Sequence, residues 1–137
     1  MTTLPARIVH LSIERPADEV SAFVGDPRNM QRWASGLSEG LTPDGDDWIG
    51  GGGPLGDIHV RFAPKNEVGV VDHTVTLPDG TQVYNALRVS PNGDGCEVAF
   101  TVLRQSTQDD AAFEADAAHV LKDLQTLKAL MEREAGR

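Results

Sequence analysis

The C-terminal third of the chain places the strongest limit on the fold, because it predicts one long amphipathic helix. Apolar residues recur there at helical spacing, and no glycine or proline interrupts the pattern before Gly136. Ser106 and Asp109 have the spacing of a capping box, with Asp in place of Glu. A helix of about 26 residues is about 39 Å long, so its stripe needs a concave sheet to cover it. The predicted stripe is Phe113, Ala117, Val120, Leu121, Leu124, Leu127 and Met131.

The N-terminal part predicts one strand followed by two short helices. Residues 8–14 alternate between apolar and polar side chains, as a half-buried strand does. Pro16 suits the first turn of a helix that Gly25 ends, and Asp26–Pro27 begins a second helix by the same logic. The inner sides of these elements are predicted to carry Val9, Leu11, Ile13, Val20, Phe23, Val24, Met30 and Trp33.

The middle of the chain predicts an antiparallel meander. Residues 40–56 contain seven glycines and two prolines, which indicates a loop with a short strand around Trp48. Alternating segments then follow one another with tight turns between them, as in a meander. The predicted strands are 58–62, 68–77, 82–89 and 96–104, and the predicted turns are 78–80 and 92–95.

Size, charge and cysteine content exclude several classes of protein. We expect a single domain over residues 1–137, which is an ordinary domain length. The net charge is −9, and no run of Lys or Arg occurs, so neither nucleic-acid binding nor docking on an anionic membrane is expected. The lone Cys96 excludes an internal disulfide. Residues 1–7 lack an apolar signal core and no apolar run reaches about 18 residues, which predicts a cytoplasmic protein without membrane insertion.

Several segments resemble one known superfamily over about residues 7–134. They are Ile13–Val20, Asp26–Pro27 with Trp33, Arg88–Val89, Val98–Thr101 and the stripe from Phe113 to Met131. In these segments the chain resembles the START-like, or Bet v 1-like, superfamily, and within it the bacterial polyketide cyclase/dehydrase and lipid-transport (SRPBCC) group. Arg15 and Ser21 depart from the group's pattern, since a small residue and an aromatic residue are usual at those positions.

The resemblance implies an α+β helix-grip fold. In this fold a curved antiparallel sheet wraps around a long C-terminal helix, with two short helices after the first strand. It also implies a cavity between sheet and helix that holds an apolar small molecule. The superfamily shares no catalytic residues, so none is transferred to this chain.

Turn geometry predicts which residues of the sheet face that cavity. A three-residue turn at 78–80 places His73 opposite Asn85, and a turn centred on Asn92–Gly93 places Asn85 opposite Phe100. The two registers give one consistent apolar face, which supports them because a slip by one residue would invert a strand. The predicted inward residues are Val71, Val75, Leu77, Val83, Leu87, Val89, Cys96, Val98, Phe100 and Val102.

Three polar residues, His73, Asn85 and Arg104, fall on this apolar face. Burying such groups without partners costs about 1–3 kcal/mol each, so they must bond one another, water or a ligand. His73 and Asn85 are therefore either a satisfied core pair or the polar anchor of a ligand pocket. His73 is the one weak candidate for a catalytic acid or base. Arg104 lies near a strand end. Its guanidinium therefore either faces the cavity or extends into solvent.

Other motifs give little chemistry. The segment 51–56 matches G-x-G-x-x-G but precedes a strand rather than a helix, so it predicts a surface loop or a lid at the pocket mouth. His59 alternates with inward residues and should face outward, and no metal-ligand spacing or nucleophile motif occurs. Cys96 is predicted to be a core residue. Neither a cofactor nor a metal is therefore predicted.

The sequence supports three hypotheses about function. The first is binding or carriage of a small hydrophobic or aromatic molecule between sheet and C-terminal helix. The second is a cyclase/dehydrase-type enzyme that uses His73 as acid or base, and the third is a protein-interaction module with a filled core. Trp33 is either a core contact or pocket lining, and dimerisation through a sheet edge stays open. The predicted ligand-binding residues are His73, Asn85, Phe100, Trp33, Arg104 and Phe113.

Overall fold

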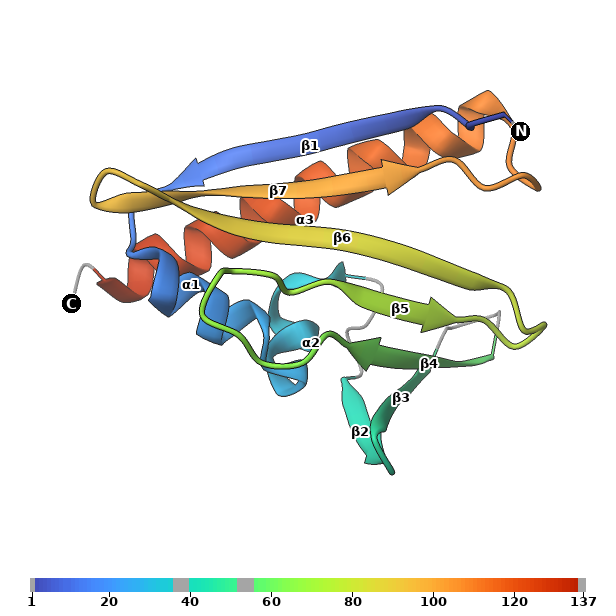
Figure 1. The fold of residues 1–137 in the computed structure, drawn as a ribbon, viewed down its shortest axis with the longest axis horizontal. Coiled ribbons are helices and arrows are strands. Elements are labelled where there is room, and N and C mark those ends of the chain that lie inside the picture. Colours follow the sequence, from blue (N-terminus) through green and yellow to red (C-terminus); the bar gives the residue numbers. More distant parts are fainter. Residues whose placement is uncertain (1, 36–39, 52–55, 136–137) are drawn as a thin grey trace.

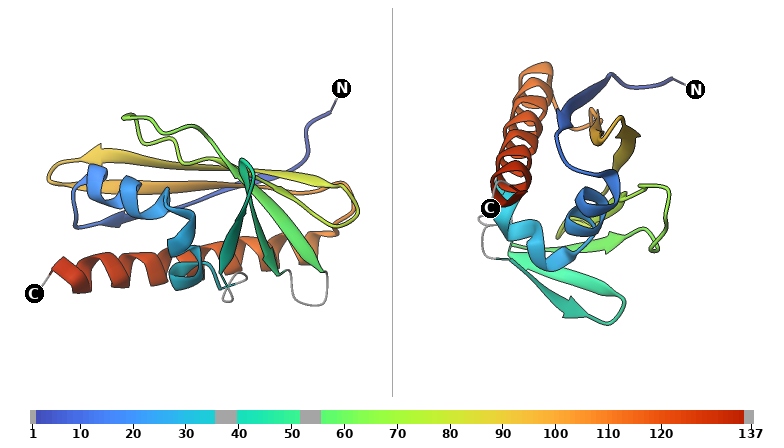
Figure 2. Two further views of the ribbon diagram at one scale, coloured as in Figure 1. Left: turned by 90° about the horizontal axis from the view of Figure 1, so that it is seen from below. Right: turned by 90° about the vertical axis from the view of Figure 1, so that its left-hand side faces the viewer.

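A computed structural model describes residues 2–35, 40–51 and 56–135, with side chains as far as Arg133. It contains one seven-stranded antiparallel sheet in the order β1-β7-β6-β5-β4-β3-β2, which curves beside a long C-terminal helix (Figures 1 and 2). The predicted α+β helix-grip arrangement is therefore confirmed. The elements are β1 (Ala6–Ile13), α1 (Ala17–Val24), η1 (Pro27–Asn29), α2 (Met30–Trp33), β2 (Leu41–Asp44), β3 (Asp47–Gly51), β4 (Asp57–Phe62), β5 (His73–Thr76), β6 (Gln82–Asn92), β7 (Gly95–Leu103) and α3 (Asp110–Ala135).

The predicted helices after the first strand both form. Pro16 is the N-cap of α1, and Val20 and Val24 are its fully buried residues. Asp26 then begins η1, because its carboxylate accepts the Arg28 backbone N–H at 3.0 Å and Pro27 suits the first helical position. These short helices lie between the sheet and α3 (Figure 2, left).

The segment 40–56 is more regular than predicted. The predicted short strand around Trp48 forms as Asp47–Gly51. It pairs in a β-hairpin with Leu41–Asp44, which was predicted to be loop, and Gly45 lies in the turn at φ +61°. Pro43 did not indicate a strand, but β2 is an edge strand, where a residue without an N–H is tolerated. The lid predicted at 51–56 falls largely on residues outside the described ones.

Strand β5 is shorter than the predicted strand 68–77. Regular pairing covers only His73–Thr76, because the carboxylate of Asp72 accepts the Leu87 N–H at 2.9 Å, the kind of donor that a ladder carbonyl takes up elsewhere in a sheet. The regular ladder therefore ends at Asp72. Residues 63–71 form a protruding segment, in which the Val71 N–H still donates to the Leu87 carbonyl oxygen at 2.9 Å.

Gly69 returns this segment to the sheet. It has φ +79°, and a Cβ at this position would lie 1.9 Å from the carbonyl oxygen of Val89. Only glycine fits such a close approach in this conformation. The Gly69 carbonyl accepts the Val89 N–H at 2.9 Å, and Val70 forms an isolated bridge with Arg88.

The predicted pairing of β5 with β6 is confirmed, whereas that of β6 with β7 is shifted by two residues. His73 lies opposite Asn85 as predicted. The second turn is centred on Gly93–Asp94 rather than Asn92–Gly93, so Leu87 rather than Asn85 lies opposite Phe100. The position of the turn follows from Gly93, which has φ +58°. A tight hairpin turn favours a glycine with positive φ at its first central position. An even shift leaves every side chain on its predicted face.

Helix α3 has the predicted length of 26 residues but a narrower buried stripe. Asp109 rather than Ser106 is its N-cap, since the Asp109 carboxylate accepts the Ala112 N–H at 2.8 Å. Leu121 was predicted inside, yet it is 39% exposed, because α3 packs on the sheet along a seam of residues three and four apart and Leu121 lies beside that seam. The buried seam is Phe113, Ala117, Leu124, Leu127 and Met131. Among the described residues no helix is long and apolar enough to cross a membrane.

Candidate functional site

His73 lies among aromatic side chains on the concave face of the sheet. It is 4% exposed, with the Phe62 ring stacked on it at 5.4 Å between centroids and the Phe100 ring edge-on at 6.2 Å. Asn85 Nδ2 lies 3.3 Å from His73 Nε2, and the Val71 carbonyl oxygen lies 3.4 Å from Nδ1. The predicted His73–Asn85 pair is thus in contact, although both hydrogen bonds are long.

These contacts define the chemistry open to His73. Burial lowers the pKa of His73, so the neutral imidazole is the form that the core holds. With Nδ1–H donating to Val71 and Nε2 accepting from Asn85, both ring nitrogens have protein partners. This is the arrangement of a satisfied core histidine. A substrate could exchange a proton with the ring only by displacing the Val71 carbonyl or the Asn85 amide.

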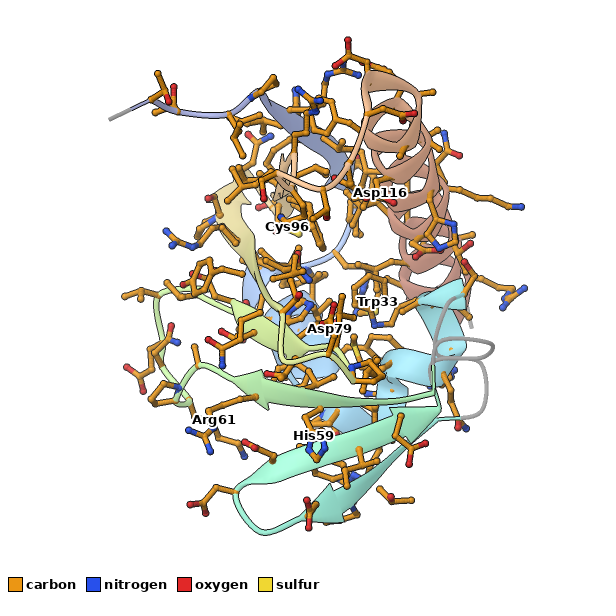
Figure 3. All side chains as sticks on the ribbon, turned by 90° about the vertical axis from the view of Figure 1, so that its right-hand side faces the viewer. Trp33, His59, Arg61, Asp79, Cys96 and Asp116 are labelled. Atoms are coloured by element: carbon orange, nitrogen blue, oxygen red, sulfur yellow. The ribbon has the colours of Figure 1, made fainter. Side chains whose placement is uncertain are left out.

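The other predicted ligand-binding residues lie apart from this group. Trp33 is buried between α3 and the sheet (Figure 3), and its Nε1–H has no hydrogen-bond partner among the described residues. Phe113 is buried under the Arg7 guanidinium, which lies 5.6 Å above its ring. Arg104 donates to the Gln108 carbonyl oxygen from Nε at 3.0 Å and Nη2 at 2.8 Å, so it fastens the segment before α3.

A large open cavity lies elsewhere. An open cleft of about 1260 Å³ separates α1 and η1 from the protruding segment 63–71, and we call it the α1 cleft. Trp48 and Pro43 of the β2–β3 hairpin border it, as do Val89 and Pro91 of β6. None of the six predicted ligand-binding residues lines it. Figure 2 (right) shows α1 and segment 63–71 side by side.

Small residues of α1 form one wall of the α1 cleft. Ala17, Ser21 and Gly25 are four apart and all line it. The two walls come closest at Gly25. A Cβ at this position would lie 3.3 Å from Cγ1 of Val71 on the opposite wall. The Ser21 hydroxyl makes no hydrogen bond with any described residue, so it is available to a bound molecule. The spacing of these small residues was the only sequence signal for this wall.

Segment 63–71 forms the opposite wall and is held by one side chain. The Asn66 amide donates to the carbonyl oxygens of Pro64 (3.0 Å) and Val70 (2.8 Å). Its oxygen accepts the N–H groups of Val68 (3.0 Å) and Val70 (3.1 Å). These four bonds satisfy the amide within the segment. Val68 stands at the rim and is 76% exposed, an unusual position for a large apolar residue.

Prolines and aromatic rings give the cleft an apolar surface that offers few donors. Pro27, Pro43, Pro64 and Pro91 all line it, and a proline has no backbone N–H. Trp48 is half-buried there. Phe62 lines the cleft as well and stacks on His73, so one ring joins the cleft to the His73 group.

Charged groups lie on both walls of the cleft. Arg28 donates to Asp26 from Nε (3.0 Å) and Nη2 (2.9 Å). This hydrogen bonding lowers the pKa of Asp26, and the positive charge of Lys65 across the cleft adds to the effect. Lys65 itself makes no hydrogen bond or ion pair with a described residue. Asp18 and Glu67 are the remaining charged residues of the lining.

A buried carboxylate on the outer face fixes the base of segment 63–71. Asp72 is 2% exposed and accepts hydrogen bonds from the Tyr84 hydroxyl, the Leu87 N–H and the Arg88 guanidinium (Nε and Nη2, both 2.8 Å). Hydrogen bonding to Arg88 is the main cause that lowers the pKa of Asp72 to about 2. Sequence reasoning missed this residue, whose only signal was a charge within an apolar run.

Ser35, His119 and Asp123 form a second polar group between α2 and α3. Ser35 Oγ lies 2.9 Å from His119 Nε2 and 2.8 Å from Asp123 Oδ1. His119 Nε2 also faces Asp123 Oδ2 at 3.5 Å. A catalytic triad uses both ring nitrogens in series, whereas here one nitrogen faces both partners. The group therefore fastens α2 to α3, since Asp123 also accepts the Ser35 N–H at 3.2 Å.

Other predictions concern single residues. Cys96 is a buried free thiol as predicted, and His59 faces away from the core with 44% of its side chain exposed. Within residues 2–35, 40–51 and 56–133, no group of three His, Cys, Asp or Glu side chains is placed to hold a metal ion.

Comparisons with known proteins establish the fold alone. No family model matches the chain, and no curated protein matches it in sequence. Among solved structures, the chain is similar to DynU16, a protein of the dynemicin biosynthetic locus, at 16% identity and a TM-score of 0.71. The match covers 93% of this chain but 47% of DynU16, so this chain spans about half of that protein.

Two shorter proteins match over nearly their whole length. XoxI from Bacillus cereus is 11% identical with a TM-score of 0.70, covering 93% of this chain and 95% of that one. MLL2253 from Mesorhizobium loti is 12% identical with a TM-score of 0.73, covering 94% and 98%. These likenesses support the predicted fold, and membership of the polyketide cyclase/dehydrase and lipid-transport group stays a prediction.

Proposed function

We propose that this protein binds or carries a small, largely apolar molecule, and that the molecule occupies the α1 cleft. The observation that carries this proposal is the open cleft of about 1260 Å³, bordered by four prolines, Trp48 and Phe62. Ligand pockets are concave, mainly apolar and furnished with a few polar groups, and their volumes run to about 1,000 Å³. A cleft of this size suits an extended chain or several fused rings.

This location differs from the predicted one between sheet and C-terminal helix. The space beside α3 is filled by buried side chains such as Leu124 and Leu127, whereas the α1 cleft is open to solvent. His73 would then contribute indirectly, because it supports the Phe62 ring that lines the cleft. Binding rather than catalysis is the function that this arrangement supports best.

A substitution that fills the cleft tests the proposal. Ser21→Phe places a ring against the α1 wall, and Ser106→Phe, at an exposed position before α3, is the matched control. We expect the wild-type protein and Ser106→Phe to bind the uncharged dye Nile red with enhanced fluorescence. Ser21→Phe should bind it at least about tenfold more weakly, which corresponds to about 1.4 kcal/mol.

Circular dichroism and the melting temperature must show that Ser21→Phe is folded. Retention of full dye binding by the folded variant would contradict the α1 cleft as the site. If neither the wild-type protein nor the control binds Nile red, and dodecanol likewise leaves the melting temperature unchanged, the binding function itself is wrong.

A further inference from the structure

The cations of the α1 cleft indicate which class of apolar molecule it takes. Among the described residues that line the cleft, only Arg28 and Lys65 are basic, and they lie on opposite walls. Arg28 belongs to η1, and Lys65 belongs to segment 63–71. A ligand lying in the cleft therefore passes between two positive charges.

Neither cation is fully used by the protein. The Arg28 guanidinium engages Asp26 through Nε and Nη2, and its Nη1 makes no hydrogen bond with a described residue. The Lys65 ammonium group has no hydrogen bond or ion pair in the described part of the chain, although its charge acts on Asp26 across the cleft. An ammonium group carries three donors and a guanidinium five, so both retain donors for an anion.

We propose that the ligand of the α1 cleft is an amphipathic acid, whose single carboxylate binds between Lys65 and Arg28 while its apolar body lies against the proline and aromatic surface. This inference rests on the proposed binding function. The Ser21 hydroxyl, which has no hydrogen-bond partner among the described residues, is a further donor for an oxygen of the same ligand.

The neighbouring acids limit the charge of the ligand. Asp26 already neutralises part of Arg28, and Asp18 and Glu67 also line the cleft. A doubly charged group such as a phosphate monoester would meet these carboxylates at short range, and like charges at short range are unfavourable. A single negative charge is therefore the better match.

Affinities for three molecules with the same apolar chain test this inference. Dodecanoate, dodecanol and dodecylamine compete with Nile red at about pH 8, where the acid is ionised, below the concentrations at which they form micelles. We expect dodecanoate to bind about twofold to fivefold more tightly than dodecanol, as is typical of a solvent-exposed charge pair. Dodecylamine should bind most weakly.

Lys65→Gln is the decisive variant, and Lys122→Gln is its control because it changes the net charge equally from an exposed position on α3. Lys65→Gln should remove most of the preference for dodecanoate and leave the affinity for dodecanol unchanged, whereas Lys122→Gln should alter neither. Equal wild-type affinity for acid and alcohol, a preference for the amine, or an unchanged preference in Lys65→Gln would overturn the inference. In each of those results dodecanol still binds, so the proposed function stands; failure of dodecanol to bind would instead count against that function.

Discussion

Along α3 the inner face of the sheet is covered by side chains that water does not reach, whereas beside α1 the same sheet borders an open cleft. The packed region contains Leu87, Val98, Leu124 and Leu127, each at most 1% exposed. The open region is lined by prolines and by small residues of α1. The difference lies in the second layer. Helix α3 supplies a long row of large side chains, whereas α1 buries Val20 and Val24 and presents Ala17, Ser21 and its C-cap Gly25 to the cleft. One sheet thus provides both a core and a candidate site.

The largest expected effect separates the packed region from the cleft. Leu124→Ala should lower the free energy of unfolding by about 2–5 kcal/mol, because it leaves a cavity under α3. Val68→Ala at the cleft rim should change it by less than about 0.5 kcal/mol, since the side chain is 76% exposed. Chemical denaturation of both variants measures this. Similar losses in the two variants would show that the rim is as tightly packed as the core.

A second prediction concerns Asp72, which joins the cleft wall to the sheet. Asp72→Asn should destabilise the protein by about 2 kcal/mol near neutral pH, because the amide cannot accept all the hydrogen bonds that the carboxylate accepts. The matched control is Asp94→Asn in the exposed β6–β7 turn.

The Asp72 effect should depend on pH with a definite sign. The folded-state pKa of Asp72 is about 2, below its ordinary value of 3.8. Its stabilising contribution is therefore complete above about pH 4 and is lost as the pH falls toward 2. The difference in stability between the wild-type protein and Asp72→Asn should shrink over that interval. A difference that stays constant with pH would mean that the carboxylate is not specifically stabilised.

The smallest predicted effect concerns His73, at the border between the two regions. His73→Phe should cost about 1 kcal/mol at neutral pH, since the Asn85 amide loses its partner but is only half-buried. Burial lowers the pKa of His73, so the wild-type protein loses stability as the pH falls below about 6.5, when the unfolded chain takes up the proton. The variant has no imidazole to protonate and lacks this loss. Its stability relative to the wild-type protein should therefore increase from pH 7 to pH 5. Denaturation curves at both pH values measure this stability difference. A decrease in the relative stability of the variant from pH 7 to pH 5 would mean that the folded protein stabilises a charged His73.

Most of the fold could be predicted from local patterns in the sequence. The spacing of apolar residues from Phe113 to Met131 gave α3, and the turn at 78–80 gave the His73–Asn85 pairing. These features depend on neighbours along the chain or on one tight turn. The narrowness of the α3 stripe could not be predicted, because Leu121 is apolar and its exposure depends on how far the sheet reaches.

The α1 cleft depends on contacts between distant segments, which no local pattern carries. Segment 63–71 protrudes because Asp72 takes the place of a ladder acceptor, and it returns where Gly69 meets Val89. Without that geometry, residues 68–71 look like the start of a strand. The search for polar residues on the apolar face therefore led to His73 and Asn85, whereas the lining of the cleft combines residues from a helix, loops and strand ends that no single pattern joins.

Under the proposed binding function, the hydrogen bonds of Asn66 have a consequence for the rate of ligand exchange. Because this one amide already orders segment 63–71, a ligand does not have to organise the wall of the cleft when it arrives. Related ligands should then associate at similar rates, and differences in affinity should appear mainly as differences in residence time. A carrier with such a wall can load and release its cargo without a slow conformational step.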